Sequence, residues 1–318
     1  MRTILLACAL LLASDACAQA WPSRPIKLVV PFPPGGSTDI FARPIAQKLS
    51  EALKQQVVVE NRGGAGGTIG ADAVAKSPPD GYTLLMGHIG TLAVAPSLYP
   101  ALPYDPQKHF APVGMVATVA NVLVVNPAVA AKTVPELIAL AKGAPDKLTY
   151  SSGGNGSAAH IAVELFKLRT GTRIVHVPYK GTAPSVTDLV GGQVSMTMTG
   201  VPPVLEFIRG GRLRALGVSS LARIDALPEV PTIAQAGVAG FEATQWYGIV
   251  APAGTPAPVI ARLNAELRTI LESADMRERL ASLGAIADPS TPEQFAQRIA
   301  AERVRWREVV EAARIQPD

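Results

Sequence analysis

The chain has 318 residues, of which 48% are hydrophobic and 17% are charged, and its formal net charge is +4. Low charge with high apolar content excludes extensive disorder, and at about 150 residues per domain the length predicts two domains. Lys and Arg are spread along the chain and do not form a basic patch, so we expect no nucleic-acid partner.

The first twenty residues have the pattern of a secretory signal peptide. Arg2 precedes an apolar run at 4–13, and the segment ends in an Ala-Gln-Ala sequence at 18–20. The run is too short to span a membrane as a stable helix, and the A-x-A end predicts cleavage after Ala20. A lipoprotein anchored through Cys17 is the disfavoured alternative, because an acid stands in the triplet before it. We therefore expect a periplasmic protein whose mature chain has no cysteine.

Short apolar runs alternate with helical segments in the first part of the mature chain. The run 26–30 leads through a Pro-Gly loop at 31–36 into a helix with apolar residues every four positions. The run 57–59 leads through a glycine-dense loop at 61–67 into a second helical stretch, and a further apolar run covers 82–87. This alternation predicts an α/β fold with largely parallel sheets.

The stretch 111–131 carries no charge and is as long as a membrane span. Pro and Gly residues divide it into two short β-branched runs, which predicts two buried strands, and we expect a chain that does not span a membrane.

The same alternation then restarts and predicts a second lobe. A helix begins near 133, and strands are expected at 148–151 and 174–178, each followed by a small-residue loop and a helix. From residue 246 onward we expect a strand and then two long helices. The second of these opens with a capping box, Thr-Pro-Glu-Gln, at 291–294.

Three loops share one design, in which a strand runs into small residues and then into the start of a helix. They lie at 34–39, 151–157 and 179–182. At each, free backbone N–H groups and the positive end of a helix dipole stand beside hydroxyls, an arrangement that suits an anion. Ligands collect at these ends of strands in open α/β sheets. The alternative, that the glycines only make tight turns, stays open.

Other chemistries lack their required residues. The sequence 154–159 fits G-x-G-x-x-A, but no acid ends the next strand, and no Gly-Lys dipeptide forms a P-loop, so we expect no nucleotide and no other cofactor. Ser37 lacks the second glycine of a nucleophile elbow, and the histidines have no metal-ligand spacing. We expect neither catalytic nor metal-binding residues. His160 is either a ligand contact or a structural residue, and Asp39 either functions in the site or caps its own helix.

Eight motifs, in order along the mature chain, closely resemble those of the Bug family of extracytoplasmic solute receptors, the substrate-binding proteins of tripartite tricarboxylate transporters. They are WPSRPIKLVVPFPPGGSTDIFAR at 21–43, VVVENRGGAGGTIGAD at 57–72, PPDGYTLLMG at 78–87, YSSGGNGSAAH at 150–160, HVPYKG at 176–181, LRALGVSS at 213–220, LPEVPTIAQAG at 227–237 and WYGIVAPAGTP at 246–256. The resemblance implies a two-lobe periplasmic-binding-protein fold of type II, a Venus flytrap whose hinge is crossed twice. We expect a signal peptide at 1–20, lobe I at 21–120 and 245–318, and lobe II at 121–244.

The resemblance also implies which residues of the cleft hold a carboxylate. In lobe I they are Gly35, Gly36, Ser37, Thr38, Asp39 and Thr91. In lobe II they are Ser152, Asn155, Gly156, Ser157, His160, Tyr179, Lys180, Gly181, Thr182 and Thr199. Many family members carry an acid and an amide where this chain reads Met-Thr-Met-Thr-Gly at 196–200. That difference predicts a ligand without an amino group, such as a mono- or dicarboxylate.

The function implied is that of a monomeric periplasmic receptor that closes on a small organic carboxylate and delivers it to a membrane permease. A sensor that uses the same cleft to engage a membrane histidine kinase is an alternative that the sequence does not separate from transport. An exported hydrolase is less favoured, because no nucleophile is matched with a base.

Overall fold

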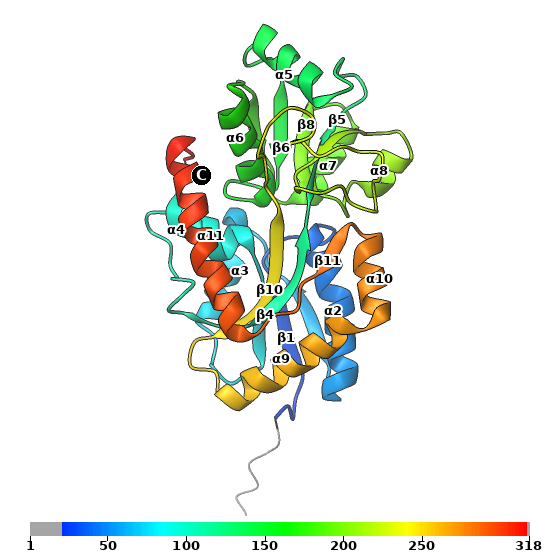
Figure 1. Ribbon diagram of the computed structural model, residues 1–318. Helices are drawn as coiled ribbons and strands as arrows, with labels where there is room; N and C mark the ends of the chain where they lie inside the picture. Colours follow the sequence, from blue (N-terminus) through cyan, green and yellow to red (C-terminus); the bar gives the residue numbers. More distant parts are fainter. Residues whose placement is uncertain (1–20, 317–318) are drawn as a thin grey trace, which may run out of the picture.

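The structure, a computed structural model, describes residues 21–316 and consists of two α/β lobes, one above the other in Figure 1. The first sheet has the strand order β11-β4-β10-β3-β1-β2, and the second has the order β7-β6-β8-β5-β9. The predicted α/β class is therefore confirmed. The signal peptide predicted at 1–20 lies outside the described residues.

The strand bounds are as follows. The first sheet contains β1 (Ile26–Val30), β2 (Val57–Asn61), β3 (Thr83–His88), β4 (Phe110–Val119), β10 (Gln245–Pro252) and β11 (Ala285–Ala287). The second contains β5 (Asn121–Val125), β6 (Thr149–Ser152), β7 (Val175–Pro178), β8 (Met196–Gly200) and β9 (Arg214–Val218). The uncharged stretch 111–131 forms most of β4 and all of β5, as predicted.

Both lobes are built to one plan. In the first, β1 pairs in parallel with β2 and β3, while β10 is antiparallel to β3 and β4. In the second, β6 pairs in parallel with β7 and β8, while β5 is antiparallel to β8 and β9. The chain passes from the first sheet to the second at Ala120, between β4 and β5, and returns just before β10 begins at Gln245. Within residues 21–316 the backbone runs from one sheet to the other only at these two passages.

Helices cover the sheets and connect their strands. The first lobe contains α2 (Ser37–Leu53), α3 (Thr68–Ala75), α4 (Ala95–Leu98), α9 (Ala257–Glu272), α10 (Ala274–Ser282) and α11 (Pro292–Ala312), with a 3-10 turn at Ala65–Gly67 and a π turn at Gly90–Val94. The second contains α5 (Val134–Gly143), α6 (Ala158–Thr170), α7 (Thr182–Val190) and α8 (Leu205–Arg209). Among the residues described, no helix combines the length and hydropathy that crossing a membrane requires.

The end of the chain differs in part from the prediction. Three helices stand where two were expected, because the Ser273 hydroxyl accepts the N–H of Met276 and starts a new helix directly after α9. The capping box at the start of α11 is confirmed, with Thr291 and Gln294 bonding each other's backbone. Helix α11 then runs along the side of both lobes (Figure 1), and its Trp306 and Val310 belong to a buried cluster that also contains Tyr150 of the second lobe.

Candidate functional site

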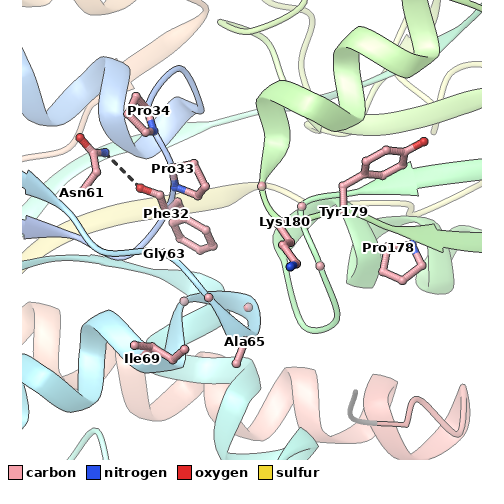
Figure 2. Close-up of a pocket in the computed structure, with 16 residues that line it drawn as sticks. Phe32, Pro33, Pro34, Asn61, Gly63, Ala65, Ile69, Pro178, Tyr179 and Lys180 are labelled. Carbon is pink, nitrogen blue, oxygen red and sulfur yellow. Dashed lines mark hydrogen bonds between the residues drawn. The ribbon is translucent and has the colours of Figure 1, made fainter.

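Residues of both lobes line a cleft made of two adjoining compartments that share Phe32 and Gly153. The outer compartment has a volume of about 780 Å³ and is shown in Figure 2. Its lining residues are Phe32, Pro33, Pro34, Asn61, Gly63, Gly64, Ala65, Gly66, Gly67, Ile69, Gly153, Gly154, Pro178, Tyr179, Lys180 and Gly181. The inner compartment has a volume of about 30 Å³. Its lining residues are Phe32, Gly36, Ser37, Thr38, His88, Gly153, Ser157, Ala158, Ala159, Thr182, Thr199, Gln245 and Tyr247.

Three helix N-termini meet at the inner compartment. Helices α2, α6 and α7 follow the N-cap residues Gly36, Ser157 and Gly181. The first N–H groups of each helix have no carbonyl partner within the helix, and the dipole adds positive potential there. Gly181 has a φ of +121°, a conformation that side chains disfavour, and a Cβ at this position would lie 2.9 Å from the ring of Pro33 across the cleft. The local geometry therefore suits an anion held by dipoles.

The two lobes touch over the inner compartment. A Cβ placed on Gly36 of the first lobe would lie 3.5 Å from Thr182 Oγ1 of the second. Nearby, Tyr99 Oη donates a hydrogen bond to the backbone oxygen of Asn155 at 3.3 Å. A volume of about 30 Å³ accommodates about two water-sized groups. The two lobes thus contact each other around a small space at the centre of the cleft.

No charged side chain lines the inner compartment, although hydroxyls are abundant. Ser37, Thr38, Ser157 and Thr199 are at most 6% exposed. His88 is also buried, and burial lowers its pKa to about 4, so it is neutral at neutral pH. An anion here would be held by amide N–H groups and hydroxyls without a cationic partner.

The outer compartment has a single charged lining side chain, Lys180. Figure 2 shows it extending from the second lobe into the space between the lobes. Tyr179 extends the opposite way, and its hydroxyl donates to Asp188 Oδ2 at 2.6 Å. Tyr179 therefore borders the compartment without offering its hydroxyl to it. Phe32, Pro33 and Ile69 supply an apolar wall opposite Lys180.

Several residues expected in the site line neither compartment: Gly35, Asp39, Thr91, Ser152, Asn155, Gly156 and His160. Burial disfavours the charge of Asp39, but hydrogen bonds from Arg43, Asn61 and the Gly35 N–H outweigh this effect and lower its pKa. Arg43 binds both carboxylate oxygens, at 2.8 and 3.0 Å. Asp39 therefore holds the loop before α2 in place.

Thr91 and the residues behind the second-lobe loop are also engaged within the protein. The Thr91 hydroxyl donates to the backbone oxygen of His88 at 3.0 Å. His160 Nδ1 accepts the N–H of Gly156 at 3.0 Å, and its ring stacks on His176 with centroids 4.1 Å apart. His176 Nε2 lies 2.6 Å from Ser152 Oγ. This stack supports the loop 152–157 from behind.

The structure adds lining residues that the sequence did not single out. Asn61 ends strand β2, Gly63–Gly67 and Ile69 follow that strand, and Gln245 and Tyr247 belong to the start of β10. The glycine-dense loop at 61–67 carries the same pattern as the other cleft loops, a strand that runs into small residues and then a helix. This shared pattern could have identified the loop as part of the cleft. For Gln245 and Tyr247 the only signal was their position at the return passage.

Comparison with known proteins gives consistent matches. The family model described as tripartite tricarboxylate transporter family receptor matches residues 41–315. Protein BugT of Bordetella pertussis is 45% identical over 300 residues, which cover 94% of this chain and 92% of BugT. The solved structure of R. palustris Rpa4515 with adipate has a TM-score of 0.91 and 39% identity, and covers 94% of this chain and 100% of its own. The structure of the periplasmic binding protein BugD has a TM-score of 0.89 and 36% identity, with coverages of 94% and 100%.

Proposed function

This chain belongs to the tripartite tricarboxylate transporter receptor family, and we propose that it captures a small organic carboxylate between its lobes in the periplasm and delivers it to a membrane permease. Proteins of this family are solute receptors, not enzymes. The observation that carries the proposal is the meeting of three helix N-termini and several hydroxyls around the small inner compartment.

The two compartments favour a linear dicarboxylate. One carboxylate occupies the inner compartment, where its oxygens accept hydrogen bonds from first-turn amides and hydroxyls. The inner compartment is much smaller than the outer one, so we place the carbon chain in the outer compartment against Phe32, Pro33 and Ile69. The second carboxylate then reaches Lys180. Neither compartment is lined by an acid, so an ammonium group on the ligand would lack a partner. The related protein Rpa4515 was solved with a dicarboxylate, adipate.

Calorimetry with three ligands of equal chain length tests this assignment. Adipate has two carboxylates, hexanoate has one, and 6-aminohexanoate has an ammonium group in place of the second. We expect affinity to fall in that order. Lys180→Met should weaken adipate binding about fivefold, the upper range for an ion pair at an exposed lysine, and leave hexanoate binding unchanged.

Two results would contradict the proposal. If 6-aminohexanoate bound as tightly as adipate, the compartments would not select against an ammonium group. If no carboxylate bound, the receptor assignment itself would fail. Delivery to a permease is tested separately by uptake: cells that lack this chain should lose uptake of the bound acid and regain it when the chain is restored.

A further inference from the structure

Two buried amide side chains join the passages by which the chain crosses between the lobes. Asn121 begins β5 just after the first passage, and Gln245 begins β10 just after the second. Gln245 Nε2 donates to Asn121 Oδ1 at 2.6 Å, and Asn121 Nδ2 donates to the backbone oxygen of Ala243 at 2.5 Å. The two side chains are only 1% and 3% exposed. The hinge therefore carries a direct hydrogen-bonded connection between its two strands.

Neighbouring groups fix the orientation of both amides. The N–H of Gly90 donates to His88 Nδ1 at 2.9 Å, so in the neutral ring the proton is on Nε2. His88 Nε2 then donates to Gln245 Oε1 at 3.3 Å, and Tyr247 Oη donates to the same oxygen. With Oε1 occupied in this way, the amide nitrogen of Gln245 must face Asn121. Each hydrogen bond in this network thus has one allowed donor and one allowed acceptor.

The same network forms the floor of the inner compartment. Gln245, Tyr247 and His88 line that compartment together with Ser37 at the start of α2. Gly200 of the second lobe pairs with Asn121 between strands β5 and β8, and it lies next to this network. A Cβ on Gly200 would lie 2.7 Å from both Ser37 Oγ and Gln245 Nε2. Gln245 therefore takes part in three features at once: it lines the inner compartment, it bonds Asn121 at the hinge, and it lies against Gly200 of the second lobe.

We propose that Asn121 and Gln245 are positioning residues that couple occupancy of the inner compartment to closure of the hinge. Their hydrogen bond holds the two passages in the arrangement that brings α2 against α6 and α7, and a bound carboxylate stabilises Gln245 and Ser37 in the same arrangement. A receptor without the connection has a smaller closed fraction, and its apparent affinity falls by that fraction. The coupling to ligand rests on the proposed carboxylate binding, whereas the effect on the hinge does not.

Asn121→Ala tests the coupling because Asn121 lines neither compartment. A matched control is Asn264→Ala. Asn264 is also buried, at 9% exposure, and its Nδ2 donates to the backbone oxygens of Val113 and Ser290, but all of these groups lie in the first lobe. Residues 21–318 contain no cysteine, so spin labels at Glu51→Cys of α2 and Lys142→Cys of α5 report the distance between lobes.

We expect Asn121→Ala to broaden and shift the distance distribution of the ligand-free protein and to raise the apparent Kd for adipate about tenfold, the equivalent of about 1.4 kcal/mol for the lost buried hydrogen bonds. Asn264→Ala should lower the melting temperature without either effect. If Asn121→Ala does not fold, Gln245→Glu removes the donor to Asn121 and keeps the oxygen that faces His88, and should shift the distances in the same way.

Unchanged ligand-free distances in Asn121→Ala would overturn the proposal, as would equal changes in Asn264→Ala. If the wild-type protein fails to bind adipate, the proposed ligand is wrong, and the ligand-free distances still decide the role of the hinge amides.

Discussion

Two buried histidines predict that the protein loses stability in mildly acidic solution. Burial lowers the pKa of His88 and of His160 from 6.5 to about 4, and each is 4% exposed. Each Nδ1 accepts a backbone N–H, so protonation would also break a hydrogen bond. The unfolded chain takes up protons at both sites near pH 6.5, but the folded chain does so only near pH 4. Stability contributed by neutral histidine is therefore lost as the pH falls from about 6.5 to about 4.

The magnitude follows from the two pKa values. At pH 5 an unfolded histidine is about 97% protonated and the folded one about 10%, which lowers the free energy of unfolding by about 2 kcal/mol per histidine relative to pH 8. Burial also lowers the pKa of His176, which stacks on His160, to about 3, so the acid loss is a large share of the stability of an ordinary domain.

Urea unfolding at pH 7.5 and pH 5.0, followed by tryptophan fluorescence, measures this loss. His160→Gln keeps a side-chain acceptor near the N–H of Gly156 but does not titrate, so its loss between the two pH values should be about 2 kcal/mol smaller than that of the wild type. His109→Gln, at an exposed position, is the control. Equal losses in His160→Gln and the wild type would refute the assignment of His160 as a neutral buried group.

Two further substitutions test the cleft. Ala65 on the wall of the outer compartment has a φ of +45°, so Ala65→Gly should stabilise the protein by up to about 1 kcal/mol in calorimetric unfolding; a lower melting temperature would show that the methyl group contributes packing that outweighs the strain. Gly200→Ala places a Cβ 2.7 Å from Ser37 Oγ and Gln245 Nε2, so it should weaken adipate binding at least about tenfold with an unchanged circular dichroism spectrum. Wild-type affinity in Gly200→Ala would mean that the lobes do not close this tightly around ligand.

Local sequence patterns account for much of the fold. Runs such as Ile26–Val30 are apolar and β-branched, and they are buried strands in the structure. The eight motifs indicated the receptor family and its two-lobe periplasmic-binding-protein fold, and both are confirmed by the family match and the structural neighbours. Strand β11 has only three residues, Ala285–Ala287, and becomes a strand by pairing with β4. So short a segment carries no periodicity, and it was not predicted.

Site residues could be predicted where a single loop, read locally in the sequence, supplies them. Gly36, Ser37 and Thr38 were expected from the loop before α2, and they line the inner compartment. Side-chain direction was not predictable. Tyr179 turns away because Asp188, a full helix turn and more along α7, accepts its hydroxyl. Gln245 reaches the compartment only because β10 inserts between β3 and β4, a pairing between segments more than 120 residues apart.

When helix N-termini bind an anion, the affinity depends on how closely the two lobes approach each other. A site built on an arginine side chain would depend on this less. An arginine on one lobe attracts an anion whether the cleft is open or closed, whereas the potential of a helix end falls off within its first turn. Here α2 belongs to one lobe and α6 and α7 to the other, so a few ångströms of opening would remove some of the N–H groups around the proposed anion. Lys180, at the outer compartment, would still attract the proposed diacid from solution in the open state. In the proposed mechanism the closed hinge confers tight binding, and its opening releases the ligand.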